Sequence, residues 1–151
     1  MTFDHRDPGT PEEDWARCGA LHRAPELDLA GVDRAVVFAA HPDDETLGAG
    51  GTVHRLARQG TEVRVVVATL GENSHPDSTT FTPDELARLR HEELAAAVRI
   101  LTGQDTPPVY LSLTDGGLTE EQLEAPAAEH LDWAEQGAKP LVLCTWQRDG
   151  H

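Results

Sequence analysis

The stretch Ala35-Val36-Val37-Phe38-Ala39-Ala40-His41-Pro42-Asp43-Asp44-Glu45 joins an apolar run to a cluster of polar side chains. Its apolar half is typical of a buried strand. Its polar half places one imidazole and three carboxylates at the expected carboxyl end of that strand, the edge where open α/β sheets bind ligands. Like charges this close repel one another, so we expect either a nearby cation or side chains that spread into water.

Small residues follow in Thr46-Leu47-Gly48-Ala49-Gly50-Gly51 and predict a helix that begins close to a ligand. We expect this helix over residues 46–59, with Gly60 ending it in the left-handed region. The next segment, Glu62 to Leu70, is rich in β-branched residues, which is typical of a strand covered on both faces.

Two capping boxes mark the later helices. Thr82-Pro83-Asp84-Glu85 predicts a helix that continues to about Leu101, and Thr119-Glu120-Glu121-Gln122 predicts one that continues to about Glu135. Pro126 lies inside the second helix and is expected to kink it or to reset its start.

Short strands are expected over residues 109–113 and 140–145. Strands that alternate with helices predict an α/β, Rossmann-like three-layer domain with a mostly parallel sheet. We expect residues 1–30 to form an N-terminal arm or a short helix and residues 31–151 to form the domain.

Composition narrows the function classes. The 151 residues suffice for one domain, and a formal net charge of -15 disfavours nucleic acid and anionic membranes as partners. The two cysteines, Cys18 and Cys144, suggest no disulfide framework, and Cys144 lies in an apolar run where we expect a buried, inert thiol. No leader or membrane-spanning run is visible, so cytoplasm is the expected compartment.

The polar cluster favours metal chemistry. His41 and Asp44 leave the strand three residues apart, and Pro42 bends the chain between them. A histidine and a carboxylate are two of the three protein ligands of a typical catalytic zinc ion. Asp43 is then placed to take a proton from a water molecule that zinc has acidified. The alternative is that the acidic residues only begin a helix, where they suit its dipole.

Other site types fit less well. Gly48-Ala49-Gly50 begins like a dinucleotide-binding motif, but Val53 stands at the final glycine position. No Gly-x-Ser-x-Gly elbow occurs, and a buried Cys144 would be a poor nucleophile.

The segment Ala40 to Gly51 resembles the signature of the PIG-L (LmbE-like) N-acetylglucosaminyl deacetylase family. The resemblance covers about residues 34–151 and continues, in family order, through four short motifs: Thr69-Leu70-Gly71-Glu72, Arg90-His91-Glu92-Glu93-Leu94, Leu113-Thr114-Asp115-Gly116 and the terminal Trp146 to His151.

The resemblance implies a zinc-dependent hydrolase that removes the N-acetyl group of an N-acetylglucosamine-type sugar conjugate. It assigns metal binding to His41 and Asp44. A ligand set of nitrogen and oxygen also admits iron or manganese in place of zinc. It assigns the general base to Asp43. By the same resemblance, the sugar contacts fall on Arg90 and Asp115.

Simpler interpretations exist for several of these residues. Arg90 would pair with Glu93 or Glu85 along its helix, and Asp115 would be a turn residue before Gly116. His75 and Asp77 are expected in a solvated loop. Three helical histidines are expected at the surface: His54, His91 and His130.

The end of the chain departs from the family pattern. The family closes on His-Pro-Asp-His, whose first histidine helps to stabilise the transition state and whose second is the third metal ligand. His151 matches the first, which makes it a catalytic candidate, whereas the second would fall beyond the last residue. The sequence thus resembles a domain whose C-terminal part is missing, and we expect little activity from this chain alone.

Two rival functions stay open. One is a degenerate, non-catalytic metal-binding module, and the other is a metal-dependent hydrolase of a different amide or of an ester. The sequence leaves the exact substrate and the oligomeric state undecided.

Overall fold

A computed structural model describes residues 8–145. The chain divides into two compact units, one of residues 31–145 and the other of residues 1–30 with 146–151. In the second of these, the described residues form two short helices, α1 (Glu12–Cys18) and α2 (Ala20–Arg23). His151 and the rest of the terminal motif lie outside the described residues, so their expected roles stay predictions.

The larger unit is organised around a parallel four-stranded sheet in the order β3-β2-β1-β4. The strands are β1 (Arg34–Ala39), β2 (Glu62–Val67), β3 (Val109–Tyr110) and β4 (Pro140–Cys144). β1 lies in the interior, and its first residue, Arg34, is paired with Glu62 on one side and with Pro140 on the other.

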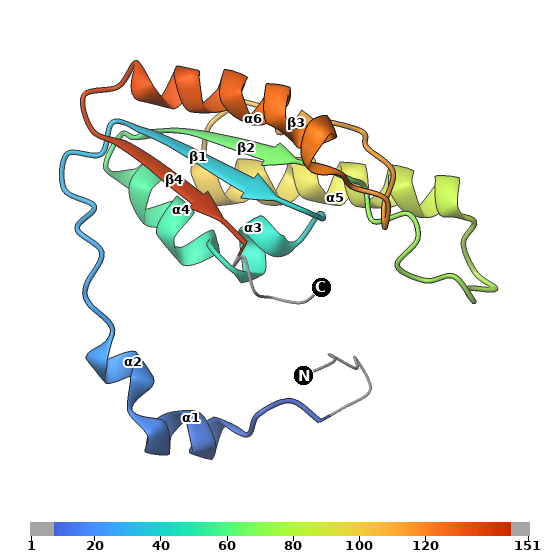
Figure 1. Ribbon diagram of the computed structural model, residues 1–151, viewed down its shortest axis with the longest axis horizontal. Helices are drawn as coiled ribbons and strands as arrows, with labels where there is room; N and C mark the ends of the chain where they lie inside the picture. The colour runs from blue at the N-terminus through green and yellow to red at the C-terminus, as the bar shows by residue number, and fades with distance from the viewer. Residues whose placement is uncertain (1–7, 146–151) are drawn as a thin grey trace. The chain divides into compact units, whose positions relative to one another are not determined.

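Helices cover both faces of this sheet (Figure 1). α3 (Asp44–Leu47), α4 (Gly50–Arg58) and α5 (Pro83–Thr102) lie on one face, and α6 (Glu120–Glu135) lies on the other. The expected α/β, Rossmann-like three-layer architecture is therefore confirmed. The core between the layers is mostly aliphatic and includes Val36, Val37, Val53, Leu56, Val65, Val66, Leu94, Val98 and Ala134.

The single helix expected over residues 46–59 is wrong. The structure has two helices, which end and begin around Gly48 and Ala49. Ala49 leaves the helical region with φ −130°. Glycine gains little from helical backbone, so a stretch with three glycines in four residues does not favour one continuous helix. The acidic residues Asp44 and Glu45 do fill the first turn of α3, as the helix-start interpretation expected.

Both expected capping boxes are present. The Thr82 hydroxyl accepts the N–H of Glu85, and the Glu85 carboxylate accepts the N–H of Thr82. Thr119 and Gln122 make the same reciprocal pair at the start of α6. Pro126 lies inside α6, which runs unbroken from Glu120, so of its two expected effects the reset of the helix start does not occur.

β3 is shorter than the strand expected over residues 109–113. Ser112 has a positive φ of 53°, which turns the chain out of the extended conformation. Leu111 and Leu113 still donate their N–H groups to the carbonyls of Val67 and Ala68, so the segment stays beside β2.

The expected burial of the Cys144 thiol is also wrong. Cys144 is exposed, as is Cys18, and both are free. β4 lies at the edge of the sheet, and alternate residues along it are exposed. An apolar run at an edge strand therefore did not imply burial.

The surface position expected for His130 is wrong, because His130 is buried. Its Nδ1 lies 3.2 Å from the Arg64 guanidinium, and its ring lies beside Phe38. Burial lowers the pKa of His130 below its usual 6.5, and the Arg64 charge lowers that pKa further. His54 and His91 are exposed, as expected.

The lowered pKa of His130 predicts a pH-dependent stability. The unfolded chain binds a proton at His130 more readily than the folded chain does, so the free energy of unfolding falls as the pH drops below about 6.5. Urea denaturation at a series of pH values should show this loss, and His130→Gln should flatten it. His75→Gln, at an exposed histidine, is the control and should leave the slope unchanged. An equal slope in His130→Gln and the parent chain would contradict the prediction.

No helix among the described residues is both long and apolar enough to cross a membrane. The expected cytoplasmic location stays a prediction.

Candidate functional site

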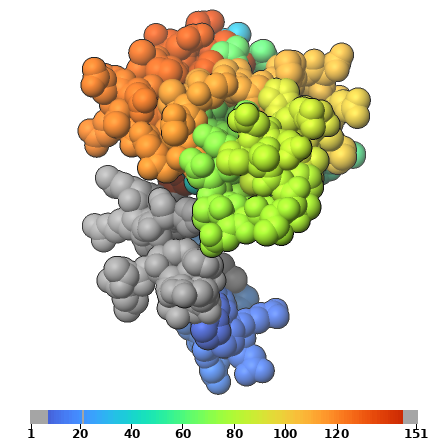
Figure 2. Space-filling model, turned by 90° about the vertical axis from the view of Figure 1, so that its right-hand side faces the viewer, coloured from blue at the N-terminus to red at the C-terminus, as the bar shows by residue number. Residues whose placement is uncertain are grey.

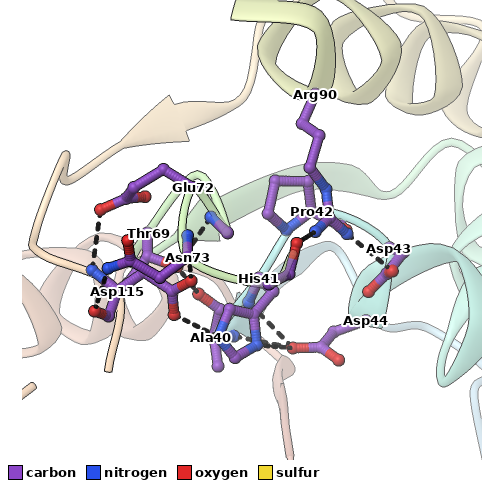
Figure 3. Close-up of polar contacts among 12 residues, drawn as sticks. Ala40, His41, Pro42, Asp43, Asp44, Thr69, Glu72, Asn73, Arg90 and Asp115 are labelled. Carbon is purple, nitrogen blue, oxygen red and sulfur yellow. Dashed lines mark hydrogen bonds and ion pairs between the residues drawn. The ribbon is translucent and has the colours of Figure 1, made fainter. Parts of the chain in front are cut away.

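The loop after β1 is fixed by the side chain of Asp44. Asp44 Oδ2 accepts the backbone N–H groups of Ala40 and His41, each at 3.0 Å. These bonds satisfy two donors just beyond the end of the strand and close the chain into a tight turn. The same oxygen lies 4.0 Å from His41 Nδ1 (Figure 3). The local sequence thus brings an imidazole nitrogen and a carboxylate oxygen close together.

Asp43 has a strained backbone. Its φ of 123° is rare for a residue with a side chain, and such residues cluster at functional sites at a cost of about 1–3 kcal/mol. Glu45, which is 1% exposed, accepts the Asp43 N–H at 3.0 Å and thereby holds this conformation. The Asp43 carboxylate itself remains half exposed. The strain therefore presents this carboxylate to solvent.

Arg90 reaches the same loop from α5. Its guanidinium donates to the Pro42 carbonyl at 2.6 Å and to Asp43 Oδ2 at 2.9 Å, and it also donates to the Ser74 hydroxyl. Figure 3 shows this side chain extending from the helix to the loop. Arg90 therefore contacts this loop and does not pair with Glu93 or Glu85 along its helix, as the simpler interpretation would have it. Glu85 instead caps α5.

Gly71 makes room for Arg90. Gly71 has a φ of +64°, and a Cβ at this position would lie 2.5 Å from the Arg90 guanidinium. An alanine at this position would strain the backbone and would force the Arg90 guanidinium to shift.

His41 also contacts a second acidic residue, Asp115, which follows β3. His41 Nε2 lies 3.0 Å from Asp115 Oδ1. Asp115 is indeed in a turn, as the simpler interpretation expected, but its carboxylate also points at the imidazole (Figure 3). Figure 2 shows the yellow-green surface of the loop after β2 beside the orange surface around residue 120.

Sequence reasoning gave no role to Glu72 and Asn73. Glu72 Oε1 accepts the Asp115 N–H, and the Asn73 backbone N–H and side-chain amide donate to the Asp115 carboxylate and carbonyl. These residues follow β2, whose carboxyl end lies beside that of β1. That position in a parallel sheet was the signal that could have found them. His75 and Asp77, in the same loop, are exposed as expected.

The donor atoms of His41 and Asp44 fit a zinc ion. Zinc binds imidazole nitrogen and carboxylate oxygen tetrahedrally at about 2.0–2.2 Å, so two of its ligands lie about 3.3–3.6 Å apart. His41 Nδ1 and Asp44 Oδ2 are 4.0 Å apart, so a small side-chain shift would bring both groups into one zinc shell. Within residues 8–145 no group of three or more His, Cys, Asp or Glu side chains gathers as a complete metal site.

Comparison with known proteins gives this site a family. The sequence profile described as PIG-L, GlcNAc-PI de-N-acetylase, matches residues 36–151. A 1D-myo-inositol 2-acetamido-2-deoxy-alpha-D-glucopyranoside deacetylase from Streptomyces avermitilis is 35% identical over 136 residues, which are 78% of this chain and 46% of the relative. The protein of the same name from Corynebacterium efficiens is 41% identical over 80 residues, 49% of this chain and 25% of the relative.

Two solved structures share the fold. N,N'-diacetylchitobiose deacetylase from Pyrococcus horikoshii has a TM-score of 0.63 and 25% identity, over 87% of this chain and 49% of that one. A 4-carboxy-2-hydroxymuconate hydratase from Pseudomonas putida has a TM-score of 0.59 over 73% of this chain and 45% of that one, and at 23% identity it shows the fold alone. The chain spans less than half the length of each of these four proteins, and the profile over residues 36–151 shows that it belongs to the PIG-L family.

Proposed function

We propose that this chain carries part of the active site of a zinc-dependent deacetylase, which hydrolyses the N-acetyl group of an N-acetylglucosamine-type sugar conjugate. The observation that supports this most is the loop after β1, where Asp43 is exposed and strained between two residues whose donor atoms fit zinc. In addition, the two named relatives, at 35% and 41% identity, are deacetylases of an amino sugar conjugate.

In this proposal His41 and Asp44 hold the zinc ion. A zinc ion bound there would act as a Lewis acid, polarising the acetyl carbonyl and lowering the pKa of water toward about 7. The pair suits this task because Asp44 is itself fixed by two backbone N–H groups, which keeps its carboxylate close to the His41 imidazole.

Asp43 acts as the general base. It takes a proton from water as the water oxygen forms a bond to the acetyl carbon, and the carbon–nitrogen bond then breaks. The proton passes to the departing nitrogen, so the products are acetate and the free amine. Arg90 holds the Asp43 carboxylate in place at 2.9 Å. His151 is proposed to stabilise the negative charge that develops on the carbonyl oxygen.

Arg90 and Asp115 remain our candidates for contacts with the sugar. Both side chains are mostly buried at the strand-end loop, with 16% and 9% of their side-chain surface exposed. A carboxylate has about four acceptor sites, so the contact of Asp115 with His41 does not prevent it from also accepting a sugar hydroxyl.

Zinc titration and acetate release test this function. We expect the chain to bind zinc, and we expect a version extended past His151 to release acetate from N-acetylglucosamine conjugates. Zinc binding without turnover in the extended version would favour the non-catalytic module. Turnover confined to other amides or to esters, in a substrate panel, would favour a hydrolase of a different bond. Absence of zinc binding in both versions would refute the proposal.

A further inference from the structure

Each polar atom of Asp115, in the backbone and in the side chain, makes a hydrogen bond or an ion pair. Its backbone N–H donates to Glu72 Oε1 at 2.9 Å, and its carbonyl accepts from the Asn73 side-chain amide at 2.9 Å. Its Oδ2 accepts the Asn73 N–H at 3.0 Å, which leaves Oδ1 directed at His41 Nε2. Asn73 holds the carboxylate, and Glu72 and Asn73 hold the backbone that carries it, so the carboxylate imposes an orientation on the imidazole instead of turning to follow it.

The contact also selects one tautomer of His41. An ionised carboxylate only accepts hydrogen bonds, so His41 Nε2 must carry the hydrogen that it donates to Asp115. The lone pair of the neutral ring is then on Nδ1, the nitrogen that lies 4.0 Å from Asp44 Oδ2. The nitrogen needed for a metal is thus set by the hydrogen bond that the other nitrogen makes.

We propose that Asp115 is a positioning residue that fixes the tautomer and ring orientation of His41, and that Glu72 and Asn73 in turn fix Asp115. This inference rests on the proposed role of His41 as a metal ligand. It adds a function to Asp115 that a sugar contact does not require. It also accounts for the three hydrogen bonds that join the loop after β2 to Asp115 in the turn after β3, two at its backbone and one at its side chain.

Asp115→Asn separates this role from a sugar contact. Both Asp115 oxygens accept from N–H groups, whereas an asparagine side chain has only one oxygen. The Asn73 backbone can only donate, so that oxygen is expected to face Asn73, and the amide N–H₂ then faces His41. The variant should therefore shift the hydrogen of His41 to Nδ1, the nitrogen that is directed at Asp44.

Nitrogen-15 NMR of the histidine rings in the 151-residue chain, without metal, measures this directly. We expect the Nε2–H tautomer at His41 in the parent chain and the Nδ1–H tautomer, or a mixture, in Asp115→Asn. Zinc affinity of the same proteins should fall about 10- to 100-fold in the variant. Asp77→Asn makes the same charge change in the exposed loop and should alter neither quantity.

Two results would overturn the inference. One is an Nδ1–H tautomer at His41 in the parent chain, which requires no variant to fold. The other is a folded Asp115→Asn chain with an unchanged tautomer and unchanged zinc affinity; a raised KM in the extended version would then indicate a sugar contact alone. Failure of both the parent chain and the extended version to bind zinc would instead refute the proposed function, and the tautomer measurement would still decide the role of Asp115.

Discussion

Asp43→Asn is expected to lower turnover by about 10²- to 10⁴-fold while leaving zinc affinity nearly unchanged. Asparagine has almost the shape of aspartate and keeps an oxygen that can accept from Arg90, so the loop should stay in place. It cannot take a proton from water, so the step assigned to Asp43 is lost. The measurement is acetate release by the version extended past His151, together with zinc titration of the same protein.

His41→Ala tests the other half of this assignment, in which His41 is a metal ligand and Asp43 is not. Removing the imidazole should abolish most zinc binding, because it deletes one of the two donors that lie 4.0 Å apart. Asp84→Asn, in the exposed first turn of α5, serves as the charge-matched control and should preserve both activity and zinc affinity. If Asp43→Asn and His41→Ala lost zinc equally, the roles of base and ligand would be wrongly assigned.

Gly71→Ala is expected to disturb the site more than its backbone strain alone would. An alanine at a φ of +64° costs about 1–2 kcal/mol in the left-handed region. Its Cβ would also lie 2.5 Å from Arg90 Nη1, so the guanidinium must move from Pro42 and Asp43. Hydrogen bonds of a charged group contribute about 1.5–3 kcal/mol, which is the further loss we expect if these contacts break.

Gly103→Ala provides a matched control for this effect. Gly103 has the same φ of +64°, but no atom lies within 4 Å of the added Cβ. Urea denaturation of the two variants therefore separates strain from collision, since only Gly71→Ala displaces an arginine. Turnover in the extended version should fall in Gly71→Ala and stay at the parent value in Gly103→Ala. Equal losses of stability and of turnover in the two variants would show that Arg90 shifts without consequence.

Much of the architecture could be predicted because its signals are local. The capping boxes at Thr82 and Thr119 are recognisable within four residues, and both form as expected. The alternation of apolar strands with helices also sufficed for the α/β class. Predictions failed where the burial of a residue depends on contacts with segments that are distant in the sequence. The apolar run of Cys144 forms an exposed edge strand, and the helix of His130 packs its histidine toward the sheet.

The sequence by itself determined the strand, the bend at Pro42 and the proximity of His41 and Asp44, because these residues are neighbours along the chain. Only the tertiary structure decided that Arg90 reaches Asp43 and that Asp115 reaches His41, across separations of 47 and 74 residues. Parallel strands bring their carboxyl ends to one edge, but the order of the strands and the paths of the loops decide which side chains meet there. The partner of each imidazole nitrogen, and with it the chemistry of the ring, therefore follows from the fold.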